Sequence, residues 1–599
     1  ISLGQGQGPR ALQKLRLAIK KGYWLLLHNL HLMPSWLPVL VRELDAMTPS
    51  KSHADFRLFL SSDPEKSIPA GLLSRSLKLT NEPPSNLKDN VKRAVCHFDR
   101  DTFESLDNPS RGVLFGLCYF HALMLGRKKF GAIGFNSEYQ FSLQDLQSSF
   151  VVLRNYMEHG PQNIPWQDLQ YLFGDIMYGG HIINDFDRTL CAAYMEYFMT
   201  DRLLDEMEMF PFLQQSGSSG GVSFSFKAPA PTTLENYLER IDAQLPDETP
   251  MAYGLHPNAE IRYRTILSGD MCKSIYNLME ADGDGGAGPE GADARRRRKK
   301  KVGVLDEQPN PHSAAQNAAE SRISDLLDNL ANESEVMFDI EDIESALDMQ
   351  DIRPFENVLL QECLLSNALI TEIIRSIQEL RMGLHGELTM TEDMEQLAQD
   401  LAIDAVPAAW SNISYPTERS LPSWLMDLRL RIDQLQDCVA RGLQLPMVTW
   451  ISGLINPVSF LTAVLQTHAR STSTEFDTLS TATEVLKRQI ADISSQAREG
   501  NYLTGLYLEG ARWDMMANNL VSSYPKQMYC KMPVILVKAV TADKDPLANK
   551  QAQRQIYMCP VYRTTRRCDT YVFTAHLKTK AQPAKWIMAG VALLMDVEG

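Results

Sequence analysis

The chain has 599 residues, 44% of them hydrophobic, and its 59 basic and 74 acidic side chains give a formal net charge of −15. At roughly 100 to 200 residues per domain, this length predicts about three or four domains, and the composition excludes wholesale disorder and collagen-like repeats. The acidic balance disfavours general nucleic-acid binding. The 9 cysteines include no Cys-x-x-Cys pair, which favours reduced thiols in the cytosol over a disulfide framework or a zinc knuckle.

The first residues predict an α/β arrangement. Residues 9–21 carry apolar positions at helical spacing, and residues 23–27 form a short apolar run typical of a buried central strand. A second helix over 35–46 and a second strand over 56–60 follow. Strand, helix and strand at this spacing indicate a parallel sheet.

The middle of the chain is predicted to be mainly helical. Helices are expected over 86–95, 111–125, 142–158, 165–173 and 185–206, the last with Asp185 as its N-cap. Residues 214–231, rich in Ser, Gly and Pro, predict a linker.

Residues 281–319 predict a disordered insertion, because their glycine and charge cannot bury enough apolar surface to offset the ordering entropy. Deleting them is expected to leave the melting temperature nearly unchanged. The basic run 295–301 is interpreted as a solvated part of this loop. The alternatives are a contact with an acidic surface such as tubulin, with nucleic acid, or a nuclear address.

The last part begins with helices predicted over 355–382, 422–441 and 459–470 and ends in strands over 503–508, 533–540, 555–564, 569–576 and 586–594. These strands predict a small antiparallel β-barrel. Its core is expected to contain Trp513 and Trp586, with exposed partner-binding tryptophans as the alternative. The uncharged stretch 442–467 contains Pro446 and Pro457, so no membrane span is predicted there.

The motifs argue against nucleotide hydrolysis. The sequence has no Gly-x-x-x-x-Gly-Lys-Ser/Thr loop, and the glycines at Gly4, Gly6 and Gly8 indicate a tight turn. His28 and Asn29 follow the first strand, where a nucleoside triphosphatase places an acidic pair that holds magnesium.

Other polar residues are predicted to be structural. Asp185, Asp187 and Arg188 stand at a helix start, where caps and ion pairs are commoner than acid/base or metal chemistry. His121 lies in an apolar helical run and is interpreted as a core histidine. No catalytic residue and no metal site is predicted.

Many short strings, in order along the chain, resemble the last ring module and C-terminal domain of dynein heavy chains, with an axonemal rather than a cytoplasmic pattern. These strings are Ile1-Ser-Leu-Gly-Gln-Gly-Gln7, Leu27-His-Asn-Leu-His-Leu32, Asp55-Phe-Arg-Leu-Phe-Leu60, Thr80-Asn-Glu-Pro-Pro84, Gly131-Ala-Ile-Gly-Phe-Asn136, Tyr178-Gly-Gly180, Gly254-Leu-His-Pro-Asn258, Trp450-Ile-Ser-Gly453, Leu506-Tyr-Leu-Glu-Gly-Ala-Arg-Trp513, Cys559-Pro-Val-Tyr562 and Trp586-Ile-Met-Ala-Gly-Val591. The family's usual Arg and Asp after Tyr-Gly-Gly are His181 and Asn184 here.

The resemblance implies a degenerate AAA+ module without its N-terminal part: an α/β large subdomain (residues 1–85) and a helical small subdomain (86–213). Residues 214–280 would link it to an α+β C-terminal domain of helices (320–500) and a barrel (501–599).

The resemblance also implies that the whole protein is an ATP-driven, minus-end-directed microtubule motor for ciliary and flagellar beating. ATP and magnesium would bind in upstream modules of the same heavy chain, microtubules through regions absent here, and intermediate and light chains would be partners. This segment would be non-catalytic, structural and regulatory, located in the cytoplasm and the axoneme. The alternatives are a free-standing protein-interaction adaptor and an independent enzyme that uses Asp185 and Asp187.

Overall fold

The computed structural model describes residues 1–4, 6–47, 52–63, 68–79, 84–158, 164–212, 225–230, 232–246, 248–284, 337–347, 351–541 and 555–597. The protein divides into two compact units, Ile1–Pro83 and Pro84–Gly599.

The first unit is a small α/β fold. It contains α1 (Gly8–Lys21), β1 (Trp24–Leu27), α2 (Leu37–Asp45), β2 (Arg57–Leu60) and α3 (Ala70–Arg75). The two strands pair in parallel, Trp24 opposite Arg57, which confirms the predicted strand–helix–strand arrangement. Gly6 has a φ of +79° in the turn before α1.

The prediction of a fully buried first strand is wrong, because helices cover only one face of the sheet. Leu25 and Leu27 pack into the core of this unit with side chains of α1 and α2. The alternate residues face away: Trp24 is 73% exposed and lies against Phe59 of β2, with 5.5 Å between the ring centroids. Alternation along a strand thus leaves an apolar face uncovered within this unit.

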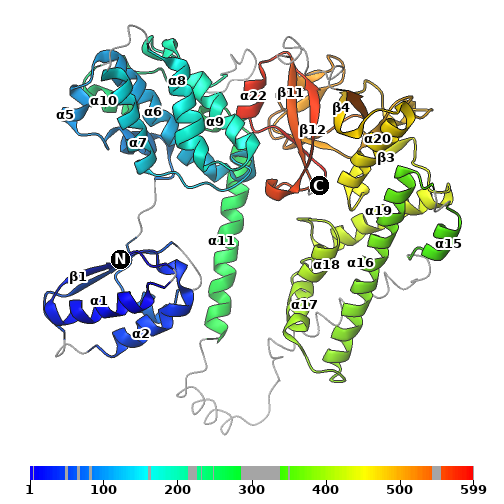
Figure 1. Cartoon of the computed structure of the whole chain (residues 1–599), viewed down its shortest axis with the longest axis horizontal. Coiled ribbons are helices and arrows are strands. Elements are labelled where there is room, and N and C mark those ends of the chain that lie inside the picture. Colours follow the sequence, from blue (N-terminus) through cyan, green and yellow to red (C-terminus); the bar gives the residue numbers. More distant parts are fainter. Residues whose placement is uncertain are drawn as a thin grey trace, which may run out of the picture. The chain divides into compact units, whose positions relative to one another are not determined.

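The second unit begins with a domain of helices, here called the first helical domain (Figure 1). Its helices are α4 (Leu87–Val95), α5 (Arg100–Glu104), α6 (Asn108–Arg127), α7 (Leu143–Glu158), α8 (Trp166–Tyr171), α9 (Asp185–Phe198), α10 (Leu234–Gln244) and α11 (Ala259–Asp284). Helix α6 is buried along nearly its whole length, so the others pack around it.

Two expectations for this domain need correction. The side chain of Asn184, not Asp185, caps α9 by accepting hydrogen bonds from the backbone N–H groups of Phe186 and Asp187. Helix α9 ends at Phe198, and a short 3₁₀ helix, Asp201–Leu204, follows.

The two predicted linkers lie mostly outside the described residues. Of the first, residues 225–230 are described, and Phe226 and Ala228 are buried in the core of the first helical domain. Of the predicted insertion, residues 281–284 form the end of α11, and the rest lies outside the described residues.

The next helices form the second helical domain. They are α15 (Ile340–Ser345), α16 (Pro354–Leu384), α17 (Glu392–Ala402), α18 (Ala408–Ile413), α19 (Leu421–Ala440) and α20 (Pro457–Thr472). The three helices predicted here are confirmed. Within the described part of the protein, α16 alone is long and apolar enough to cross a membrane, and half of its most apolar window is buried in the fold. Burial against neighbouring helices accounts for its apolar stripe.

The strand domain is the last described part of the chain. It contains β3 (Val448–Trp450), β4 (Leu479–Val485), β5 (Asn501–Thr504), β6 (Tyr507–Glu509), β7 (Arg512–Asp514), β8 (Asn519–Val521), β9 (Tyr529–Lys531), β10 (Ile535–Thr541), β11 (Ile556–Tyr562), β12 (Tyr571–Lys578), α22 (Pro583–Met588) and β13 (Ala592–Leu594). One sheet has the order β3-β5-β10-β4, another β12-β11-β13-β6-β9, and β7 pairs with β8.

The predicted barrel is found only in part. No strand pairing among the described residues closes either sheet, and two pairs, β3 with β5 and β11 with β13, are parallel. The two sheets meet at β4 and β12, where the His576 N–H donates to Thr483 Oγ1 (2.6 Å). The strand domain is therefore made of mixed sheets joined at one edge.

Two of the predicted strands are interrupted in the structure by a glycine with a positive φ. Residues 503–508 divide between β5 and β6, in different sheets, because Gly505 has a φ of +96° between them. Residues 586–594 contain the end of α22 and then β13, separated by Gly590 with a φ of +66°. The prediction that Trp586 lies on a strand is wrong.

Candidate functional site

The most elaborate polar site joins the first helical domain to the strand domain, and Arg127 is at its centre. Arg127 is fully buried. Its Nε donates to Gly134 O (2.7 Å), its Nη1 to Tyr253 O (2.8 Å) and Tyr194 Oη (2.5 Å), and its Nη2 to Met588 O (2.8 Å) and Ile133 O (3.3 Å). One guanidinium thus ties α6 to α22, 461 residues later in the sequence.

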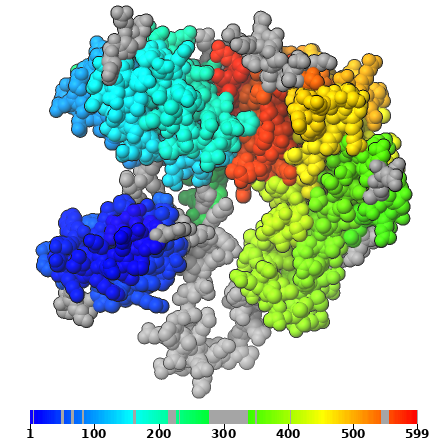
Figure 2. Space-filling view, in the orientation of Figure 1, coloured from blue at the N-terminus to red at the C-terminus, as the bar shows by residue number. Residues whose placement is uncertain are grey.

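The sequence builds this site through the turn after α6. Gly131 has a φ of +62°, which directs the backbone so that Ile133 and Gly134 present their carbonyl groups to Arg127. A Cβ on Gly134 would lie 2.2 Å from Arg127 O, so the approach needs glycine. Figure 2 shows the first helical domain, in cyan, directly against the red part of the strand domain.

A second buried arginine lies at the same junction. Arg567 is 3% exposed, and its Nη2 donates to Glu509 Oε2 (2.6 Å) and to Gly590 O (2.7 Å). Glu509 is also buried and belongs to β6. Because removing one member of a buried pair leaves an uncompensated charge, this pair fixes the loop before β12 on the sheet.

Asp187 organises the helical side of the junction, whereas Asp185 and Arg188 do not reach it. Asp187 accepts hydrogen bonds from the backbone N–H and the side chain of Asn136, from Ser137 N and from Tyr139 Oη. Burial raises the pKa of Asp187 above its usual value despite these bonds. Asp185 and Arg188 are exposed, and no ion pair joins either aspartate to Arg188 in the described residues.

His181 and Asn184, which replace the Arg and Asp usual in the family that the sequence resembles, both have partners close in the structure. His181 Nε2 lies 3.3 Å from Asp145 Oδ1, and Asn184 caps α9. His121 is fully buried in the core, as expected, with its Nδ1 2.8 Å from Tyr178 Oη.

His28 and Asn29 lie at the end of β1 in the first unit. His28 Nδ1 is 2.7 Å from Ser61 Oγ. Asn29 has a φ of +61° and donates from Nδ2 to Ser2 Oγ (3.4 Å). Both side chains therefore hold neighbouring backbone segments together at the edge of the sheet.

Trp513 and Trp586 belong to one hydrophobic cluster of the strand domain. Their exposed fractions are 6% and 2%. Trp586 Nε1 donates to Thr579 Oγ1 (2.7 Å).

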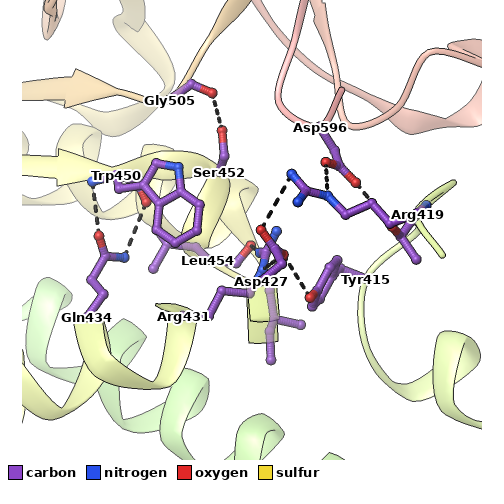
Figure 3. A network of polar contacts seen from close by, with 12 residues as sticks. Tyr415, Arg419, Asp427, Arg431, Gln434, Trp450, Ser452, Leu454, Gly505 and Asp596 are labelled. Carbon is purple, nitrogen blue, oxygen red and sulfur yellow. Dashed lines mark hydrogen bonds and ion pairs between the residues drawn. The ribbon is translucent and has the colours of Figure 1, made fainter. Parts of the chain in front are cut away.

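A buried ionic network joins the second helical domain to the strand domain (Figure 3). Asp427 of α19 accepts hydrogen bonds from Tyr415 Oη (2.8 Å) and Arg431 Nε (2.6 Å). Arg419 lies between two carboxylates: its Nε donates to Asp596 Oδ1 (2.6 Å), and its Nη2 is 3.7 Å from Asp427 Oδ1. Asp596 lies just after β13, so this contact fixes the end of the strand domain on the helices.

Glu362 of α16 makes a further connection between the helices and the turn before α20. It is 1% exposed and accepts hydrogen bonds from the backbone N–H groups of Ile455 (2.6 Å) and Asn456 (2.7 Å). Burial raises the pKa of Glu362.

The chemistry of these groups is structural. Each buried charge donates to or accepts from backbone or an opposite charge, and in the described part of the protein no cluster of three His, Cys, Asp or Glu side chains could hold a metal ion. Sequence reasoning missed Arg127, Arg567, Glu362 and Asp427. The one available signal was a charged residue among apolar neighbours of a long helix, as at Glu362.

Comparison with known proteins identifies the family. Residues 1–80 match the model described as the D6 P-loop domain of the dynein heavy chain, residues 110–259 its AAA lid domain, and residues 294–595 its C-terminal domain. The protein is 41% identical over 617 residues to the dynein beta chain, flagellar outer arm, of Chlamydomonas reinhardtii. It is 40% identical over 605 residues to the ciliary dynein beta chain of Tripneustes gratilla and 38% identical over 605 residues to human dynein axonemal heavy chain 17.

Each of these alignments covers 100% of the 599 residues and 12% of the relative. The family models follow one another in the order of the structure: the first unit, the first helical domain, and the second helical domain with the strand domain. The chain belongs to the dynein heavy chain family.

Proposed function

We propose that these residues are the C-terminal, non-catalytic part of an axonemal dynein heavy chain, an ATP-driven microtubule motor of cilia and flagella. The observation that carries the proposal is the ordered match of three dynein models from residue 1 to residue 595. The relatives named flagellar, ciliary and axonemal support the location in the axoneme.

In this proposal, upstream AAA+ modules of the same heavy chain bind ATP and magnesium, and other regions bind microtubules. Intermediate and light chains are the expected partners. The residues encoded before Ile1 in the transcript test it, because a motor heavy chain requires upstream AAA+ modules there. A methionine start close to Ile1 would contradict the proposal and favour a free-standing adaptor.

The role of this segment is to brace the ring. Buried, hydrogen-bonded charges support this, since Arg127, Arg419 and Arg567 each join parts of the protein that are distant in sequence. We further propose that the two sheets of the strand domain act as one barrel-like unit that holds the second helical domain. The hydrogen bonds between Thr483 and His576 and the shared apolar cluster around both sheets support it.

The segment is predicted not to bind ATP. Its P-loop motif is absent, and His28 and Asn29 hold Ser61 and Ser2 instead of offering carboxylates to magnesium. Calorimetric titration of the 599-residue protein with Mg-ATP is expected to show no saturable heat. The double variant His28→Asp, Asn29→Glu is the matched control. It is also expected to show no saturable heat with Mg-ATP, because acidic residues alone cannot supply the phosphate loop. Micromolar affinity of the unmodified protein would contradict the prediction.

A further inference from the structure

A cavity of about 490 Å³ lies at the junction of the first helical domain and the strand domain. One wall comes from the turn after α6 and the start of α9, and the other from β11, the loop after it, and α22. The lining is mainly apolar, with Ile133, Phe186, Leu190, Ile556, Ile587 and Val591 as its larger hydrocarbon groups. Pockets that hold small organic molecules have this volume and this kind of lining.

The cavity has a buried floor and an accessible rim. Ile133 and Val591 are 5% and 1% exposed. Met558 and Thr189, which also line the cavity, are exposed. A ligand can therefore enter from solvent and lose most of its contact with water once inside.

Arg567 supplies an unused set of donors on this lining. Its Nη2 is occupied by Glu509 and Gly590. No described residue accepts a hydrogen bond from its Nε, and no described acceptor is found for its Nη1. A buried Nε–H without a partner is costly, because the donor has lost its hydration and gained no hydrogen bond.

The other charged groups of the lining do not fill this gap. Arg127 donates only to carbonyl and hydroxyl oxygens, so its positive charge has no described carboxylate in direct contact. Asp187 accepts from Asn136, Ser137 and Tyr139, so its oxygens face the loop that it organises. The lining itself carries two arginines and one aspartate, and the carboxylate of Glu509, which pairs with Arg567, lies outside it.

We propose that this cavity is a binding site for a small apolar carboxylate, with the carboxylate on Arg567 and the hydrocarbon part against the apolar wall. One carboxylate oxygen can accept from the Arg567 Nε–H, which has no described acceptor, in a charge-assisted hydrogen bond. Because such a ligand would touch both the first helical domain and the strand domain, its binding would stabilise their junction.

Octanoate is a suitable probe, with octan-1-ol as the uncharged molecule of the same length. Calorimetric titration of the 599-residue protein is expected to show one saturable octanoate site with a Kd below about 1 mM, and octan-1-ol at least about tenfold weaker. Octanoate is also expected to raise the unfolding temperature in proportion to its occupancy.

Two variants test the location of the site. Ile587→Trp places a large ring in the cavity from a partly exposed position and is expected to weaken octanoate binding by at least about tenfold. Leu430→Trp, at a position 57% exposed on α19, is the matched control and is expected to bind like the unmodified protein. Arg567→Lys keeps the charge beside Glu509 but removes the planar donors, and weaker octanoate binding is expected.

Absence of saturable octanoate binding would overturn the proposal. So would equal affinity for octan-1-ol, or unchanged affinity in Ile587→Trp. If Arg567→Lys does not fold, the comparison of Ile587→Trp with Leu430→Trp decides.

Discussion

Replacement of Arg127 is expected to destabilise both the first helical domain and its junction with the strand domain. Arg127→Met keeps a long apolar stem but removes the donor to the carbonyl groups of Ile133, Gly134 and Met588 and to the Tyr194 hydroxyl, whereas Tyr253 O still accepts from Tyr194 Oη. Each buried acceptor that is left without a partner costs about 1 to 3 kcal/mol, so the free energy of unfolding is expected to fall by at least about 3 kcal/mol. Urea unfolding of the protein, followed by circular dichroism, measures this change.

The control is Arg188→Met. Arg188 is exposed and donates a single described hydrogen bond, to Ile182 O (2.9 Å). Its replacement is expected to change the unfolding free energy by less than about 0.5 kcal/mol. Equal effects of the two substitutions would show that the buried network does not hold the junction.

His121 should make the first helical domain sensitive to acid. Burial lowers the pKa of His121 from 6.5 to about 4, with Asp145, Arg93 and His97 as the nearby charged or titratable groups. Below pH 6.5 the unfolded state binds a proton at this position that the folded state does not bind. The contribution of neutral His121 to the free energy of unfolding is therefore fully present above pH 6.5. It decreases as the pH falls toward 4, by about 3 kcal/mol in total.

The measurement is the unfolding free energy of the unmodified protein and of His121→Gln at several pH values between 7 and 4, each compared with its own value at pH 7. The variant lacks the titrating ring, so it is expected to lose less stability over this window. Parallel pH profiles for the two proteins would contradict the prediction. Asp187 changes the pH dependence of stability in the opposite direction, because its raised pKa favours the folded state at low pH. Since Asp187 is present in both proteins, the comparison between them still isolates His121.

The sequence predicted His121 as a core residue because it lies in an apolar helical run and no second metal ligand stands four residues later. It did not predict Arg127, which ends the same helix and looks like a surface residue followed by two lysines. Arg127 is held by backbone carbonyls from the turn that follows its helix and from two distant segments, at Tyr253 and Met588. Backbone acceptors have no signature in the side-chain pattern, so such a site cannot be found from the sequence.

At the scale of elements, amphipathic helices and apolar strands were predicted well because their periodicity is local. Helix α16 was predicted within two residues of its ends, 355–382 against Pro354–Leu384. The wrong strand predictions have one cause, glycines with a positive φ. Gly505 and Gly590 each interrupt an apolar stretch that was predicted as a single strand. The short strands β7, β8 and β9 have three residues each, too few for a period to be recognised.

Trp513 of β7 and Trp586 of α22 should both be essential to the strand domain. Each is expected to cost about 3 to 5 kcal/mol when replaced by alanine, because the lost transfer energy is added to the cost of a cavity. Urea midpoints of Trp513→Ala and Trp586→Ala measure the effect. Met516→Ala, at a position 90% exposed close in sequence to Trp513, is the control.

The alternative is that these tryptophans contribute by binding a partner. If both midpoints stay within experimental error of the unmodified protein, neither ring belongs to a cooperative core, and the barrel-like unit is not supported. A larger loss for Trp586→Ala than for Trp513→Ala is expected, since Trp586 also donates to Thr579 and no described residue accepts from Trp513 Nε1.

At the scale of the whole molecule, the sequence predicted the family through many short strings in a fixed order. It predicted an α/β part, two helical parts and a part made of strands, but not the contacts that join them. The joining contacts link Arg127 to Met588 and Arg419 to Asp596, 461 and 177 residues apart. Because these contacts depend on tertiary packing, no window of the sequence contains both partners.

The order of strands in the larger sheet has a consequence for biosynthesis. β13 lies in the middle of the order β12-β11-β13-β6-β9, although it is the last of the five to leave the ribosome. Until it emerges, the nascent polypeptide holds two separate ribbons, β11 with β12 and β6 with β9, each with an unpaired edge exposed to other proteins. A premature stop codon that removes only residues from Ala592 onward would therefore leave the ribbons unjoined, and we expect such a product to be a substrate for chaperones and proteases rather than a slightly shorter folded protein.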